Sequence, residues 1–163
     1  MNIDFVKLTK PTTEIAAAFG RWETDPALIP LIRPNQNAEA LLRTEPVSVE
    51  KLEERIIRNH IYLIYLQDQL IGAIDYQINP AHLYKKDTDT AWLGIVIGEE
   101  VGRGKGIGAH ALYYIETQIK LAGIKRIELG VFEFNTYAIK LYRKVGYQEI
   151  GRINDFTYWQ GKM

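Results

Sequence analysis

The chain has 163 residues, a mass of 18.7 kDa and 20 basic residues balanced by 20 acidic ones. This size favours one domain over residues 1–163, and the zero net charge gives nothing that draws nucleic acid or an anionic membrane. Cysteine is absent, which excludes disulfides and thiolate chemistry and fits a reducing compartment. No apolar run approaches the ~20 residues that span a bilayer, and residues 1–10 do not resemble a signal peptide, so we expect a cytoplasmic protein.

The first half of the chain predicts a strand, three helices and a hairpin. Alternation over 2–8 predicts the strand, and Thr12 or Thr13 can cap a helix that runs to about Thr24. Residues 25–37 hold three of the six prolines and predict an irregular loop. A short helix is expected over 38–43 and an amphipathic helix over 49–60. The hairpin has strands over 61–67 and 70–78, joined through Asp68 and Gln69.

The second half alternates strands with helices. The almost wholly apolar segment 90–98 predicts a strand buried on both faces, and helical spacing of apolar residues predicts a long helix from about 106 to 122. A strand over 125–132, a helix over 135–145 and a strand over 147–153 follow. Because crossover helices join parallel strands, we expect an α/β (α+β) fold. Its mixed sheet is antiparallel in the N-terminal half and parallel between 92–97 and 126–131, with helices on both faces.

Four glycines in seven positions, from Gly102 to Gly108, join the apolar strand to the long helix. Each glycine costs regular structure about 0.5–1 kcal/mol, so the group indicates a backbone used for binding. Unpaired N–H groups and the partial positive charge at a helix N-terminus suit a pyrophosphate. Arg103 and Lys105 add positive charge, and Lys105 can reach a ribose phosphate.

Three other interpretations of these glycines remain to be weighed. The Walker pattern fails, because no Lys here is preceded by Gly and followed by Ser or Thr. A dinucleotide pattern matches at Gly104, Gly106 and Ala109, with Glu128 placed for a ribose, but only 55 residues follow Gly108. The third alternative is an ordinary glycine-rich turn flanked by two solvated cations.

Arg103 to Gly108 also reads as R-x-x-G-x-G, which resembles the CoA-binding signature of the GNAT superfamily of N-acetyltransferases. A second segment, "NTYAIKLYRKVGY" at 135–147, is similar to the second signature of that family and lies one strand later, as in the family. Two patterns in the right order and context reinforce each other. The resemblance covers about 90–153. Within the superfamily, the segment to Ile153 and the following "FTYWQGK" most resemble the ribosomal-protein N-terminal acetyltransferase and small-amine branch.

This resemblance implies a GNAT-like fold with splayed central parallel strands, and a transferase. The enzyme would pass an acetyl group from acetyl-CoA to a small-molecule or peptide primary amine by direct attack through a tetrahedral intermediate. Tyr142 is then the acid that protonates the departing thiolate, and Asn135 contacts the cofactor while also suiting an N-cap. Backbone N–H groups before the glycine loop would stabilise the oxyanion, with a bulge at Gly94. The residues expected to hold CoA are Ile95, Val96, Ile97, Arg103, Gly104, Lys105, Gly106, Ile107, Gly108 and Asn135.

The general base stays open in the sequence. Some relatives carry a glutamate five residues before the motif asparagine, where this chain has Gly130. Ordered water is one alternative, and a CoA-binding sensor module without catalysis is another. Three scattered histidines without ligand spacing predict no metal site. The side-chain candidates for the base are Asp75, Tyr76, Glu99, Glu100, Glu133, His60, His82 and His110.

Acceptor choice is expected in the segments outside the two motifs, over 22–37, the helix to 60, and 79–90. Trp22, Glu23, Asp25 and Glu45 suggest an apolar and acidic surface for a cationic amine, or equally a helix end packed on the core. Family members usually continue past the "QGK" turn into a last strand, whereas this sequence stops at Met163. We therefore expect either a shortened C-terminus or pairing with a second chain, as in a homodimer.

Overall fold

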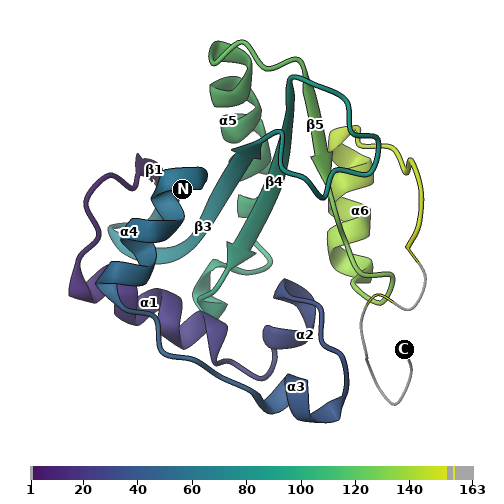
Figure 1. Ribbon diagram of the computed structural model, residues 1–163. Helices are drawn as coiled ribbons and strands as arrows, with labels where there is room; N and C mark the ends of the chain where they lie inside the picture. The colour runs from purple at the N-terminus through teal and green to yellow at the C-terminus, as the bar shows by residue number, and fades with distance from the viewer. Residues whose placement is uncertain (1, 154–155, 157–163) are drawn as a thin grey trace.

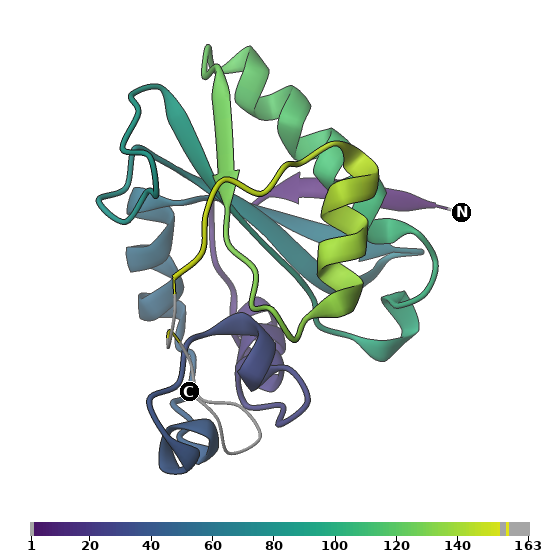
Figure 2. The ribbon, with the colours of Figure 1, turned by 90° about the vertical axis from the view of Figure 1, so that its right-hand side faces the viewer.

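The computed structural model describes residues 2–153 and 156, and it forms one five-stranded sheet with helices on both faces (Figures 1 and 2). The strands lie in sequence order, from β1 at one edge to β5 at the other. Every neighbouring pair is antiparallel except β4 and β5, which are parallel. The elements are β1 (Ile3–Lys7), α1 (Thr13–Glu23), α2 (Ile29–Ile32), α3 (Ala38–Leu42), α4 (Val49–Arg58), β2 (His60–Leu66), β3 (Gln69–Ile78), β4 (Thr90–Ile97), η1 (Glu100–Gly102), α5 (Ile107–Leu121), β5 (Arg126–Leu129) and α6 (Thr136–Val145).

The expected mixed sheet is confirmed, and so are the helix starts predicted from caps near Thr12 and at Asn135. Thr12, Ser48 and Asn135 each accept a backbone N–H with the side-chain oxygen, and α1, α4 and α6 begin at the next residue. A polar side chain at an N-cap satisfies an N–H group that has no partner within the helix. Local chemistry therefore determines where these helices begin.

Three local predictions were wrong. The proline-rich loop contains α2, with Pro30 in its first turn where a proline loses no helical hydrogen bond. The hairpin turns at Gln67 and Asp68, one residue earlier than expected, and both adopt positive φ as the tight turn requires. Residues 147–153 form no strand, because β5 pairs only with β4 among the described residues. The "FTYWQGK" segment that supported the family resemblance, 156–162, lies outside the described residues except for Phe156.

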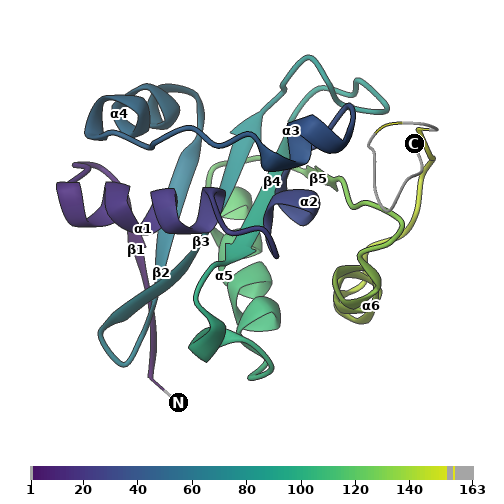
Figure 3. The ribbon, with the colours of Figure 1, turned by 90° about the horizontal axis from the view of Figure 1, so that it is seen from below.

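Two apolar clusters lie on the two faces of the sheet, and Figure 3 shows α5 on one face with α1 and α4 on the other. On one face α5 packs through Ile107, Ala111, Ile115 and Ile119, all buried, as their helical spacing predicts. On the other face α1 and α4 pack together over β2 and β3, with Leu52 of α4 fully buried. Burying each such side chain stabilises the fold by about 1.5–3 kcal/mol. The sheet is therefore fixed from both sides.

The parallel pairing of β4 with β5 covers only four residue pairs, from Thr90 with Arg126 to Leu93 with Leu129. β4 continues to Ile97, paired on its other side with β3. Beyond Leu93 the side of β4 that faced β5 has no strand partner among the described residues. The two parallel strands thus part halfway along β4.

Glu128 of β5 secures the loop that connects β3 to β4. Its buried carboxylate accepts hydrogen bonds from the backbone N–H of Tyr84, from that of Lys85 at 3.5 Å and from Arg126 at 3.0 Å. Burial alone would raise the pKa of this carboxyl, but the three donors outweigh it and hold the pKa below its usual range. Glu128 is therefore a structural anchor, and the ribose role of the dinucleotide alternative is not open to it.

We expect Glu128→Gln to lower the free energy of unfolding by about 1–3 kcal/mol at neutral pH, because a neutral amide replaces the buried acceptor. A depressed folded-state pKa contributes stability above the unfolded pKa, and this is lost as pH falls through the folded pKa. The difference between the variant and the wild type should therefore shrink in acid. Urea unfolding of both proteins at neutral and at acid pH measures this difference in the free energy of unfolding.

The matched control is Glu149→Gln, which removes an exposed carboxylate that pairs with Arg152. Exposed ion pairs contribute little, so this variant should unfold like the wild type. Equal destabilisation by both substitutions would contradict the anchoring role of Glu128.

Candidate active site

The glycine loop leaves a run of backbone donors free at the start of α5. Gly104 and Gly106 have φ of 72° and 74°, a left-handed conformation that side chains other than glycine rarely adopt. A Cβ at either position would meet no atom within 4 Å, so the space above them is open. No described residue accepts a hydrogen bond from the backbone N–H groups of residues 104–109. Consecutive free N–H groups at a helix N-terminus fit the pyrophosphate of CoA.

The third glycine brings the two sequence motifs together. A Cβ at Gly108 would lie 2.8 Å from Cδ2 of Leu141, so α6 packs directly against the first turn of α5. Ile107, expected among the cofactor contacts, is buried at the first position of α5, so its side chain packs in the core instead of facing a ligand. The two motifs are distant in sequence, and a glycine contact makes them one surface.

The two cations of the loop differ in what they do. Arg103 donates from Nε to the carbonyl of Ile97 at 3.2 Å and from Nη2 to that of Gly98 at 3.1 Å. It therefore binds the end of β4, and a phosphate contact would compete with these bonds. Lys105 is exposed within the free N–H run and remains available to an anion.

Ile95, Val96 and Ile97 lie on β4 beyond the last pair with β5, as a backbone site for the pantetheine chain requires. The bulge expected at Gly94 is absent, because the register of β3 and β4 is continuous from Gly72 with Ile97 to Ile78 with Ala91. The strands part because β5 ends at Leu129.

Gly94 has a different reason to be glycine. It pairs across the sheet with Asp75 of β3, and a methyl group at residue 94 would lie 3.1 Å from Oδ1 and 3.4 Å from Oδ2 of that residue. The Asp75 carboxylate therefore lies over Gly94, at the point where β4 leaves β5. It accepts no hydrogen bond from the described residues.

Asp75 belongs to a small charged cluster on the face that α1 and α4 cover. Arg55 of α4 forms a two-point ion pair with Glu23 of α1, at 2.6 and 2.8 Å. Burial raises the pKa of the Asp75 carboxyl to about 7, and the positive charge of Arg55 offsets the rise only in part. A carboxyl group with a pKa near neutrality exchanges protons readily at physiological pH.

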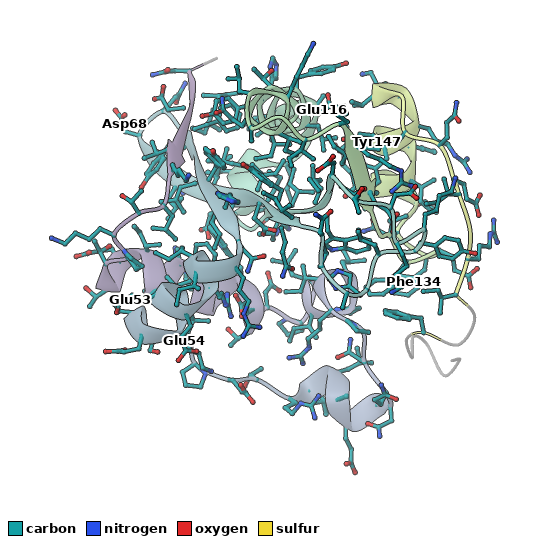
Figure 4. The ribbon with its side chains drawn as sticks, turned by 45° about the horizontal axis from the view of Figure 1, so that its top comes forward. Glu53, Glu54, Asp68, Glu116, Phe134 and Tyr147 are labelled. Carbon is teal, nitrogen blue, oxygen red and sulfur yellow. The ribbon has the colours of Figure 1, made fainter. Side chains whose placement is uncertain are left out.

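Tyr142 and its neighbour Tyr147 have different hydrogen bonding. The hydroxyl of Tyr147 donates to Glu116 of α5 at 2.8 Å (Figure 4), whereas that of Tyr142 has no hydrogen-bond partner among residues 2–153 and 156. Burial raises the pKa of Tyr142, which keeps its phenol protonated at neutral pH. The side-chain oxygen of Asn135 accepts the N–H of Ala138 as the cap of α6, so only its amide nitrogen is left for a cofactor.

Most other candidates for the base are committed elsewhere. Glu99 accepts from the indole of Trp22 and pairs with Arg21 at 3.6 Å. His60 and Tyr76 stack on each other with centroids 4.5 Å apart, and burial lowers the pKa of His60 and raises that of Tyr76. His82 packs edge-on against Trp92. Glu100, Glu133 and His110 are exposed.

The expected acidic surface for a cationic amine does not form as predicted. Trp22 is buried, Glu23 pairs with Arg55, Asp25 accepts the N–H of Ala27, and Glu45 pairs with Lys51. The packed helix end is therefore the correct alternative for Trp22. Within the described residues no group of three His, Asp or Glu side chains is arranged to hold a metal ion. No helix there has both the length and the apolar character to cross a membrane.

Comparison with known proteins identifies the family. The model of the acetyltransferase (GNAT) family matches residues 30–147. The chain belongs to this family. Membership makes it an acetyl-CoA-dependent N-acetyltransferase, and the open glycine loop fits that donor.

Among curated relatives, this GNAT chain is similar to a spermine/spermidine N(1)-acetyltransferase of Bacillus subtilis. The two are 29% identical over 124 residues, which cover 74% of this chain and 79% of the relative. The relative is named for small amines, so the ribosomal-protein half of the expected branch gains no support from it.

Solved structures agree in fold. A spermidine N-acetyltransferase of Vibrio cholerae in complex with CoA and spermine has a TM-score of 0.73 at 18% identity, covering 98% of this chain and 89% of the other. An aminoglycoside acetyltransferase in complex with coenzyme A has a TM-score of 0.70 at 14% identity, covering 95% and 90%. At these identities the likeness establishes the mixed GNAT-like sheet, as the sequence predicts.

Gly106→Ala should weaken acetyl-CoA binding about 10- to 100-fold, because strain at φ of 74° disturbs one or two charge-assisted backbone hydrogen bonds. Isothermal titration with acetyl-CoA measures the affinity.

Gly123→Ala is the control, since Gly123 ends α5 with φ of 82° and equally open space. Both variants should lose similar stability, but only Gly106→Ala should lose affinity. Wild-type affinity in both would exclude the glycine loop as the pyrophosphate site.

Proposed function

We propose that the protein acetylates a small polycationic amine, of the polyamine or aminoglycoside kind, by direct attack of the amine nitrogen on the acetyl carbonyl carbon. The observation that carries the proposal is the open stretch of β4 beyond Leu93. It has the free N–H groups of residues 104–109 at one end and the Asp75 carboxylate beside it. A surface for the acetyl donor and an acidic group beside it are what acetyl transfer to a cation needs.

The names of the similar proteins support the acceptor class. The Bacillus subtilis relative is named for spermine and spermidine, and the Vibrio cholerae structure contains spermine. An N-terminal peptide, the acceptor of the ribosomal-protein branch, is the comparison to include in any assay.

Two stretches of the chain are proposed to bind the donor, acetyl-CoA. The N–H groups of Gly104, Gly106 and Gly108, with Lys105, would bind the pyrophosphate. The backbone of 95–97 would bind the amides of the pantetheine arm, and one of its N–H groups would stabilise charge on the carbonyl oxygen. Acetyl-CoA itself supplies the activated acetyl group as a thioester.

Tyr142 is proposed as the acid. Its phenol is protonated at neutral pH and has no described hydrogen-bond partner, so it is free to donate to the departing sulfur. Tyr147, its neighbour in an edge-on contact at 6.1 Å, is held by Glu116 and is therefore less suited to the role.

We expect Tyr142→Phe to lower kcat about 100-fold while leaving acetyl-CoA affinity within about twofold, because only the proton donor is removed. Thiol release from acetyl-CoA in the presence of spermine measures turnover, and titration measures affinity.

Tyr137→Phe provides the control, because Tyr137 lies on the same helix and is exposed. It should behave as the wild type. A sensor module without catalysis predicts instead that the wild type binds acetyl-CoA but turns over no member of a panel of spermine, spermidine, aminoglycosides and peptides. Such a result would overturn the proposed function.

A further inference from the structure

Asp75 is a carboxylate that no hydrogen bond fixes to the fold, and its one charged neighbour among the described residues is Arg55. Glu128, the other carboxylate within the sheet whose pKa is shifted, is bound by three donors and holds a loop. Asp75 is half-buried on the central strand β3, between apolar neighbours in the chain, and it has no hydrogen-bond partner among the described residues. An ionisable group in such a place costs stability, so its presence indicates a function.

The position of Asp75 is fixed by strand pairing. Its partners across the sheet are Ile61 on β2 and Gly94 on β4. Because residue 94 is a glycine, no side chain lies opposite Asp75 on the β4 side. Gly94 is the first residue of β4 after the last pair with β5. The carboxylate therefore stands beside the proposed acetyl site, and a side chain at residue 94 would contact it closely.

We propose that the Asp75 carboxylate accepts the proton that the acceptor ammonium must lose before its nitrogen attacks the acetyl carbonyl carbon. This assignment rests on the proposed function and names the base that the family signature does not supply in this chain, where Gly130 occupies the position of the glutamate.

The proton balance can be followed through two groups. Asp75 takes one proton from the ammonium and returns it to solvent. The nitrogen then forms its bond to the carbonyl carbon, the carbon–sulfur bond breaks, and Tyr142 protonates the sulfur. The second proton of the nitrogen restores the Tyr142 hydroxyl, so one proton is released for each acetyl group transferred.

The charges around Asp75 suit a cationic substrate. The positive charge of Arg55 on α4 acts on the Asp75 carboxylate, and Glu23 of α1 belongs to the cluster because it pairs with Arg55. The cross-strand partners Ile61 and Gly94 bring no charge. Two carboxylates and one guanidinium give this cluster a charge of −1 with Asp75 ionised. It becomes neutral when Asp75 takes the proton. The side chains of Arg55 and Glu23 are 36% and 31% exposed, so the cluster is reached from solvent.

The cluster also sets the working pH. Burial holds the pKa of Asp75 at about 7, which is close to the optimum for a general base at neutral pH. The ion pair with Glu23 raises the pKa of Arg55 and keeps it charged. Removing this positive charge raises the pKa of Asp75 further, since Arg55 is what lowers it.

The test is kcat/KM for spermine against pH, with saturating acetyl-CoA. For the wild type we expect a rise with pH through about 7. Asp75→Asn should lower kcat/KM about 100-fold and abolish this limb while leaving acetyl-CoA affinity unchanged. The control is Asp68→Asn at the tip of the same hairpin, where the side chain is exposed and remote (Figure 4). It should keep the wild-type profile.

Arg55→Gln tests the same assignment without changing the base, and it decides the matter if Asp75→Asn fails to fold in a thermal melt. In Arg55→Gln the rise of kcat/KM with pH should move to higher pH, and in Arg55→Lys it should lie closer to that of the wild type. A wild-type profile in Asp75→Asn, or an unmoved limb in Arg55→Gln, overturns the assignment. A wild type inactive toward every amine overturns the proposed function and the assignment together, whereas an active wild type with an unaffected Asp75→Asn overturns only the assignment.

Discussion

The parting of β4 from β5 after Leu93 is the constraint on which the rest of the site depends. Backbone hydrogen-bonding groups in a sheet interior need partners, and a central strand that loses its neighbour exposes donors and acceptors. Here β4 keeps β3 on one side and is open on the other. An extended ligand with amide groups can take the place of the missing strand, as an added β-strand does. The early end of β5 thus leaves open the stretch of β4 that is proposed to bind the donor.

The two ends of this opening are held by different forces. At the glycine end, Arg103 binds the carbonyls of Ile97 and Gly98, and the ring of Trp22 lies against Gly98. The indole of Trp22 also donates to Glu99, so α1 is tied to the loop. At the other end, Glu128 fixes the connection between β3 and β4. The opening is therefore supported by hydrogen bonds that reach both neighbouring layers.

The packing of α6 on α5 brings the two sequence motifs side by side in the proposed site. Gly108 permits Leu141 to approach the first turn of α5, and the bond from Tyr147 to Glu116 fixes the end of α6 to the same helix. Tyr142 lies between these two contacts in sequence, and its ring packs edge-on against that of Tyr147. Preorganised groups of this kind raise reaction rates because little reorganisation is needed during the reaction.

The sequence by itself determined the features that rest on local chemistry. Caps at Thr12, Ser48 and Asn135 determined where three helices begin, and apolar periodicity determined the face that α5 buries. The cluster of glycines indicated a loop with free N–H groups, and Gly104 and Gly106 adopt positive φ there. Two spaced motifs were enough to place the chain in its family.

Only the tertiary structure decided which polar groups are free to act. Cross-strand register placed Asp75 over Gly94, helix packing joined Glu23 to Arg55, and long-range bonds engaged Glu99, Glu128 and Tyr147. These contacts join residues that are tens of positions apart, and no local pattern records them. The pKa of a carboxyl depends on such neighbours and on burial. In the sequence Asp75 is therefore one of several candidates for the general base, and only the fold distinguishes it from the others.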